Sequence, residues 1–177
     1  MVLGDPPQIL GSQSGLPVGK EPTGGTRSEA EMGPDSSNLG SLISERQRLG
    51  LDTHDELWAG EYHMAPAANF EHGRIGARLI RILDPVAAAA NLELSLEFNL
   101  GSPTDFRVPD LGLHRGSPMG TWIATAAIVV EVRSPDDETF EKFGFYFDHV
   151  VDEVLVADLV SRTVTWFVRG TDFYVAS

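Results

Sequence analysis

Residues 128–135 read Ile-Val-Val-Glu-Val-Arg-Ser-Pro and contain the clearest structural signal of the chain. The β-branched run starts at Thr125 and predicts a central strand that is buried on both faces, and Pro135 ends it. A carboxylate inside such a strand costs free energy unless it is paired or bound to a cation, so Glu131 is the most informative residue. Side chains alternate along a strand, so Glu131 and Arg133 share a face. Two interpretations stay open: an ion pair of Glu131 with Arg133 or another arginine, and a metal or catalytic role for Glu131.

A second carboxylate precedes this strand, in the segment Arg107-Val108-Pro109-Asp110. One loop separates the two segments, so they can form adjacent strands that place Asp110 and Glu131 side by side. Two carboxylates at the ends of neighbouring strands can hold a hard divalent cation such as Mg²⁺. The sequence therefore predicts a metal site made of Asp110 and Glu131.

The flanking segments predict an α/β fold in which a mixed sheet is flanked by helices. Apolar residues at helical spacing follow an N-cap at Asn69 and predict a helix over 70–83, which Pro85 ends before a further turn over 86–90. A second helix is expected over 137–149, with Phe140, Phe143 and Phe147 on its apolar side. Further strands are expected over 57–64, as a hairpin that turns at Ala59-Gly60, and over 92–98, 107–113, 153–157 and 163–168.

The first 40 residues are rich in Gly, Pro, Ser and Thr and have few large apolar side chains. Such a segment buries too little apolar surface to offset its ordering entropy, so we expect a disordered tail over 1–40 and one domain over 41–177. A short helix is expected over 41–49. 

The composition restricts the compartment and the available chemistry. The chain has no cysteine, which excludes disulfides, a thiolate metal site and a thiol nucleophile and fits a cytoplasmic protein. The start of the chain lacks the basic and apolar pattern of a signal peptide. The longest apolar run is far shorter than the ~20 residues of a membrane helix, so no membrane span is expected.

The charge argues against tight binding of nucleic acid by the molecule as a whole. The chain carries 26 acidic and 13 basic side chains and a formal net charge of −13. Proteins that hold nucleic acid tightly usually present a basic surface, so DNA binding requires basic residues to gather locally. The candidates for such a groove are Arg74, Arg78, Arg81, Arg107, Arg115 and Arg133.

Five segments, in order, resemble the Uma-two family, a group described as restriction endonucleases with the PD-(D/E)XK nuclease core. These segments are Leu57–Pro66 with its Gly60-Glu61, His72 at the start of a helix, Val129–Pro135, Glu141-Lys142 with Tyr146, and Glu153–Asp158. The last segment lacks the Tyr-Trp pair that is usual in the family. The resemblance covers about residues 52–170 and implies a restriction-endonuclease-like core.

The resemblance also implies an activity, a metal-dependent endonuclease that hydrolyses phosphodiester bonds of DNA with Mg²⁺ or Mn²⁺. Asp110 and Glu131 would be catalytic metal ligands, and Lys142 would be the catalytic basic residue, displaced from the strand to the following helix. The weaker candidates are Glu61, His72, Arg133 and Tyr146.

Two alternatives remain at the level of sequence. Lys142 can accept a proton from water only if burial lowers its pKa, and it can instead pair with Glu138 on the solvent side of its helix. The domain as a whole can be a catalytically silent member of the fold that binds protein, which the acidic charge favours. The retained Asp110, Glu131 and Lys142 favour the enzyme, and a homodimer is compatible with either function.

Overall fold

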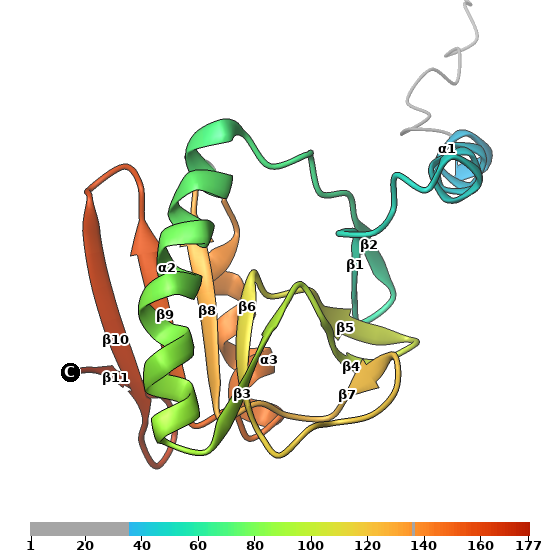
Figure 1. Cartoon of the computed structure of the whole chain (residues 1–177). Coiled ribbons are helices and arrows are strands. Elements are labelled where there is room, and N and C mark those ends of the chain that lie inside the picture. Colours follow the sequence, from blue (N-terminus) through green and yellow to red (C-terminus); the bar gives the residue numbers. More distant parts are fainter. Residues whose placement is uncertain (1–35, 136) are drawn as a thin grey trace, which may run out of the picture.

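The computed structural model describes residues 36–135 and 137–177, which form two mixed β-sheets and three α-helices (Figure 1). Residues 1–35 of the expected tail over 1–40 lie outside the described residues. Residues 36–40 belong to helix α1 (Ser36–Leu49), so the expected boundary at residue 41 falls inside a helix. Within the described ranges, no helix combines the length and the apolar character needed to cross a membrane.

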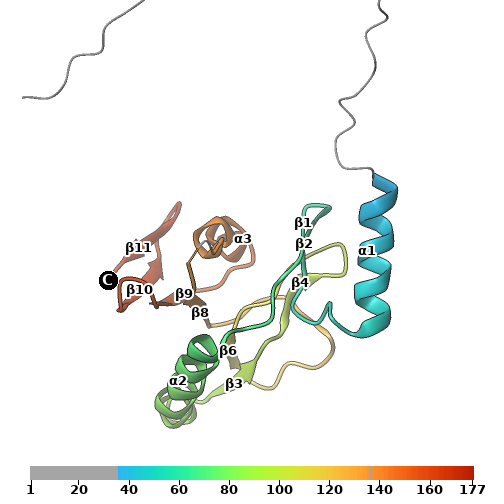
Figure 2. The same cartoon turned by 90° about the horizontal axis from the view of Figure 1, so that it is seen from above.

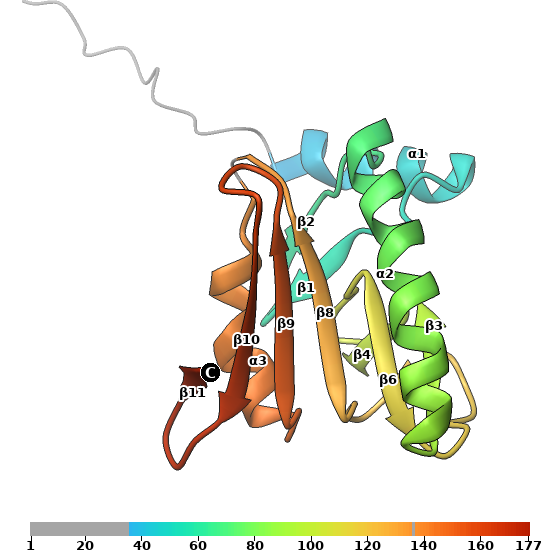
Figure 3. The same cartoon turned by 60° about the vertical axis from the view of Figure 1, so that its left-hand side comes forward.

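The larger sheet has six strands in the order β11-β10-β9-β8-β6-β3 (Figure 3). Its strands are β3 (Leu92–Leu96), β6 (Leu111–Arg115), β8 (Ile128–Arg133), β9 (Glu153–Asp158), β10 (Thr163–Arg169) and β11 (Tyr174–Ala176). Strand β8 lies inside the sheet, antiparallel to β6 and parallel to β9. Val129, Val130 and Val132 are at most 1% exposed, which confirms the predicted central strand.

Helix α2 (Phe70–Ala89) and helix α3 (Phe143–Asp148) cover opposite faces of this sheet (Figure 2). Because side chains alternate along β8, they contribute to two separate core clusters, one on each face of the sheet. Val129 packs in a cluster with Tyr146 of α3, whereas Val130 packs in a second cluster, against which apolar side chains of α2 lie. Glu131 therefore points to the α3 face, between the sheet and the aromatic side chains of that helix.

The smaller sheet has the order β2-β1-β5-β4-β7 and lies on the same side of the larger sheet as α3 (Figure 2). Its strands are β1 (Glu56–Trp58), β2 (Glu61–His63), β4 (Asn99–Ser102), β5 (Asp105–Arg107) and β7 (Trp122–Ile123). Leu100 of β4 is fully buried in the cluster that contains Val129 and Tyr146, so the two sheets share a core. The pairing of Trp58 with Glu61 confirms the predicted hairpin turn at Ala59-Gly60.

Three local predictions are wrong in detail. Helix α2 continues through Pro85, because Ala87 and the apolar side chains before it pack on the sheet and offset the lost hydrogen bond. The helix expected over 137–149 is a 3₁₀ turn (Thr139–Lys142) followed by α3, and its buried aromatic residues are Phe145 and Tyr146. The single strand expected over 107–113 is divided between β5 and β6.

Asp55 connects α1 to the start of the smaller sheet. Its carboxylate accepts two hydrogen bonds from Arg46 of α1, at 2.6 and 2.7 Å, and one from the Tyr62 hydroxyl at 2.7 Å. Burial would raise the pKa of Asp55, but the hydrogen bonds from Arg46 and Tyr62 bring it below its usual value. The stabilisation is therefore present at neutral pH and is lost as the pH falls below the usual value of the carboxyl.

We expect Arg46→Ala to lower the free energy of unfolding by about 2 kcal/mol, because it removes charged hydrogen bonds from a buried carboxylate. The matched control is Arg48→Ala on the same helix, whose ion pair with Glu45 joins side chains that are 66% and 51% exposed. That control should cost less than about 0.5 kcal/mol. Urea unfolding of the full chain at neutral pH measures both, and equal losses would contradict this role of Asp55.

Candidate active site

The two predicted carboxylates lie on neighbouring strands. Asp110 directly precedes β6, whose first residue, Leu111, pairs with Val130, so the strand register continues from Asp110 to Glu131. One carboxylate oxygen of Asp110, Oδ2, accepts a hydrogen bond of 2.6 Å from the backbone N–H of Val132. The prediction that Asp110 and Glu131 lie side by side on neighbouring segments of the sheet is confirmed, with Asp110 immediately before β6 and Glu131 on β8.

Glu131 is only 4% exposed and has two partners from the following helical segment. The hydroxyl of Tyr146 donates a hydrogen bond to Oε1 of Glu131, and Nζ of Lys142 lies 3.4 Å from the same oxygen. Arg133 binds Asp158 at 2.7 Å instead, so the suggested ion pair between Arg133 and Glu131 is wrong. The structure brings Lys142 and Tyr146 to Glu131, as the resemblance implied, and directs Arg133 to another partner.

Lys142 lies between two carboxylates. Its Nζ donates a hydrogen bond of 2.9 Å to Oε1 of Glu56, and its side chain is 13% exposed. Glu138, the alternative partner of Lys142, is paired with His63 at 2.9 Å. The predicted surface pair of Lys142 and Glu138 is therefore wrong.

Glu56 is the site residue that the sequence analysis did not identify. It is 5% exposed, and its carboxylate also accepts hydrogen bonds from the backbone N–H of Val108 at 2.7 Å and from Nε1 of Trp58 at 2.6 Å. Glu56 lies two positions before Trp58 on β1, so the two side chains share a face of the strand. This spacing was the one feature of the sequence that could have indicated a buried role for Glu56. Glu61, the candidate from the same hairpin, pairs with Trp58 through the β1–β2 ladder, but its exposed side chain makes no hydrogen bond or ion pair with the described residues.

His72 extends the site towards solvent. It lies in the first turn of α2, where its backbone N–H is capped by the side chain of Asn69 at 2.9 Å. Its Nε2 is 2.8 Å from Oδ1 of Asp110, and its Nδ1 is 3.4 Å from the hydroxyl of Ser134. The hydrogen bond with Asp110 raises the pKa of His72. His72 thus holds Asp110 from the side opposite to the Val132 N–H.

Burial and neighbouring charges shift the pKa values of both Glu131 and Lys142. Burial raises the pKa of Glu131 to about 8, against the opposing effect of the Lys142 charge. Burial alone would lower the pKa of Lys142, but the charges of Glu131 and Glu56 outweigh it and raise that pKa above its usual value. The condition under which Lys142 could accept a proton, a pKa lowered by burial, is therefore not met. Lys142 is a fixed cation at neutral pH.

The residues fit a divalent cation held by two carboxylates. Among residues 36–135 and 137–177, no three His, Asp or Glu side chains form a closed metal cage. Mg²⁺, however, commonly binds one or two carboxylates and keeps water or phosphate oxygens as its other ligands. Asp110 has unused lone pairs, and Oε2 of Glu131 accepts no hydrogen bond from the described part of the chain. The charge of Asp110 also raises the pKa of Glu131, a repulsion that a cation would relieve.

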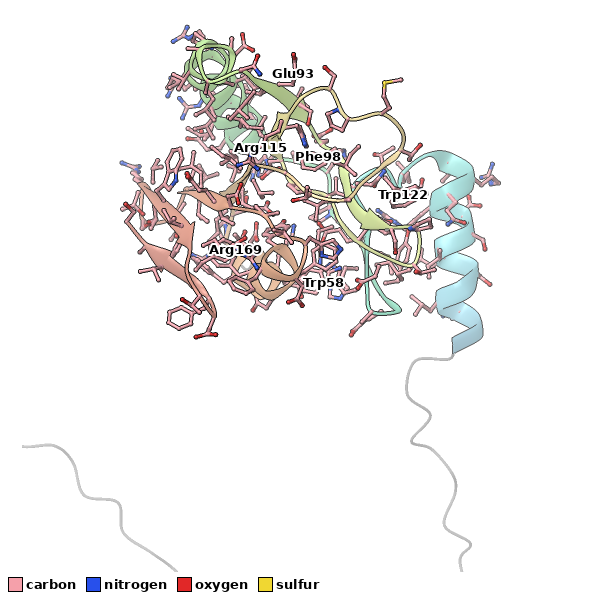
Figure 4. The ribbon with its side chains drawn as sticks, turned by 90° about the horizontal axis from the view of Figure 1, so that it is seen from below. Trp58, Glu93, Phe98, Arg115, Trp122 and Arg169 are labelled. Carbon is pink, nitrogen blue, oxygen red and sulfur yellow. The ribbon has the colours of Figure 1, made fainter. Side chains whose placement is uncertain are left out.

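The arginines expected near the site do not converge on it. The guanidinium of Arg107 lies between the rings of Trp58 and Phe145, with its Cζ 4.4 and 4.1 Å from their centroids. Figure 4 shows Trp58 beside α3, where this sandwich joins the smaller sheet to the helix. Arg115 is 70% exposed and pairs with Asp152 at 2.5 Å. Arg107 has a structural role, and Arg115 belongs to the surface.

A mixed sheet with two strand-end carboxylates and a buried lysine defines a protein of the restriction-endonuclease-like class. A solved structure titled as a "putative nuclease belonging to DUF820", from Anabaena variabilis ATCC 29413, matches with a TM-score of 0.59 and 14% identity, over 69% of this chain and 75% of that one. No curated protein is significantly similar. The family model Uma2, described as "Putative restriction endonuclease", matches residues 45–177, and the chain belongs to this family. Membership supports a nuclease-like function.

We expect Lys142→Met to lower the free energy of unfolding by about 3 kcal/mol at neutral pH, because it leaves Glu56 without its buried cation. The loss should be larger at pH of about 9, since Glu131 ionises in the native protein only above about 8 and then also lacks its partner. Urea unfolding at the two pH values measures the effect. A variant as stable as the wild type would contradict this ion cluster.

Proposed function

We propose that the chain is a metal-dependent endonuclease that hydrolyses phosphodiester bonds of DNA. The supporting observation is the arrangement of Asp110 and Glu131 on adjacent strands, with the cation of Lys142 beside Glu131. The Asp110 side chain is 23% exposed, whereas Glu131 is buried. A phosphate can therefore approach from the Asp110 side while the other groups hold the floor of the site.

Neighbouring groups of the protein hold the two carboxylates of the site in place. The N–H of Val132 and the imidazole of His72 hold the Asp110 carboxylate in one orientation. Tyr146 does the same for Glu131. Bound Mg²⁺ or Mn²⁺ would polarise the phosphate and lower the pKa of a water molecule.

Lys142 acts through its positive charge. Because its pKa is raised, Nζ keeps its proton and donates hydrogen bonds. A preorganised ammonium in a site with little water stabilises negative charge that develops on a phosphate. Glu56 is a positioning residue, since it accepts a hydrogen bond from Lys142 and another from Val108, two residues before Asp110.

Cleavage of plasmid and single-stranded DNA, with Mg²⁺ or Mn²⁺ and with a chelator, tests the function. We expect the wild type to cleave only with the metal, and Asp110→Asn to lower the rate by about a hundredfold or more, because the charge at the site is lost. Glu61→Gln is the matched control, since Glu61 is an exposed carboxylate outside the cluster. Cleavage that persists with chelator, or in Asp110→Asn, would refute the proposal.

Metal binding can be tested apart from catalysis. We expect Mn²⁺ or Mg²⁺ to raise the melting temperature of the wild type, because a cation that binds Asp110 and Glu131 in the native protein stabilises the native state by mass action. Asp110→Asn should remove most of this rise, and Glu61→Gln should retain it. An equal rise in all three proteins would place the ions elsewhere on the acidic surface.

The alternative is a catalytically silent domain of the same fold that binds protein. Two observations favour it: the net charge of −13, and the position of Lys142, whose ammonium already offsets part of the charge of Glu131. The two functions differ in the metal response. A silent domain would show neither metal-dependent cleavage nor an increase in melting temperature that depends on Asp110.

A further inference from the structure

Three arginines that were candidates for a basic groove follow one face of α2. Arg74, Arg78 and Arg81 are separated by four and three positions, which places them on the same side of the helix. Arg162 lies in the turn between β9 and β10, at the end of the molecule where α2 begins (Figure 1). The hydrogen bond from Arg74 lowers the pKa of Glu71 most, and the charges of Arg78 and Arg162 lower it further, so both lie within electrostatic reach of this carboxylate.

The start of α2 and the end of β9 enclose a pocket with a volume of about 490 Å³. Its charged lining comes from Glu71, Arg74, Asp158 and Arg162. The turn that presents Arg162 is held in shape by Asp158, whose Oδ1 accepts hydrogen bonds from the backbone N–H groups of Val160 and Ser161, at 2.8 and 3.0 Å. The arginine is thus presented by an ordered turn.

This pocket adjoins the candidate active site. Glu71 of the pocket is followed along α2 by His72, which binds Asp110. On the other side, Ala157 of β9 lines the pocket and pairs with Val132, whose N–H also binds Asp110. His72 and Val132 thus connect the lining of the pocket to Asp110.

The local charge is positive although the whole chain is acidic. Arg133 and Arg74 already pair with the two acidic residues of the pocket, Asp158 at 2.7 Å and Glu71. Arg78, Arg81 and Arg162 are exposed and form no ion pair within the described residues. Three cationic side chains are thus left available to a ligand with negative charges.

We infer that Arg74, Arg78, Arg81 and Arg162, here called the arginine surface, bind the phosphate backbone of the DNA strand that leads to Asp110. This inference rests on the proposed function, in which DNA is the substrate. Arg74 and Arg81 are separated by about 10 Å along the helix axis. That distance matches about three phosphates of one strand of a duplex. Arginine suits this role because it is always charged and its planar guanidinium forms paired hydrogen bonds with phosphate.

The test measures binding of the full-length protein to a short DNA duplex in chelator, over a range of salt concentrations. Neutralising two phosphate-binding arginines should make the slope of log K against log salt less steep by about 2. We expect this for Arg78→Gln combined with Arg162→Gln. The matched control is Arg115→Gln, which removes an exposed arginine on β6 and should leave the slope unchanged. Melting temperatures confirm that all variants are folded.

The outcomes separate this inference from the proposed function. An unchanged slope in the double variant, an equal change in Arg115→Gln, or no DNA binding by the wild type would overturn the arginine surface. Metal-dependent cleavage by the wild type together with an unchanged slope would refute the arginine surface alone. Arginine-dependent binding without Asp110-dependent cleavage would support the arginine surface and refute the nuclease.

Discussion

The ammonium of Lys142 connects three elements of the molecule, one of which is far away in the chain. It contacts Glu56 on β1, 86 positions away, and Glu131 on β8 from the 3₁₀ turn before α3. Burying these polar groups costs free energy unless they are paired, and the contacts of Lys142 with the two carboxylates offset that cost. The contact between the two sheets and the integrity of the site therefore depend on the same group.

The order of strands and helices could be predicted wherever it depends on a local sequence pattern. The Val-rich run of β8 predicted a buried central strand, and the single loop after Asp110 predicted that the two segments are adjacent. Glu56 could not be found in this way, because its role depends on contacts with Lys142 and Val108 that no spacing along the chain encodes. The resemblance identified Lys142, and the structure corrected its expected protonation.

The errors share a physical cause. Local propensity predicted that Pro85 would end α2, but packing on the sheet contributes more than one backbone hydrogen bond. Helical periodicity likewise predicted Phe140 on the buried side of one long helix. A 3₁₀ turn changes the rotation per residue, so Phe145 and Tyr146 face the core, and Phe140 is 47% exposed.

The acidic charge and a DNA substrate are compatible if the charge is unevenly distributed. Buried acidic residues such as Glu56 and Asp55 are matched by Lys142 and Arg46, so they repel an approaching phosphate little. The exposed part of the site is the Asp110 edge, and α2 and the turn after β9 add Arg78, Arg81 and Arg162, which form no ion pair with the described residues. A polyanion would thus be guided locally to that edge while the remaining acidic surface disfavours binding elsewhere. Such a surface favours specific placement over tight binding, and its affinity must fall steeply with salt.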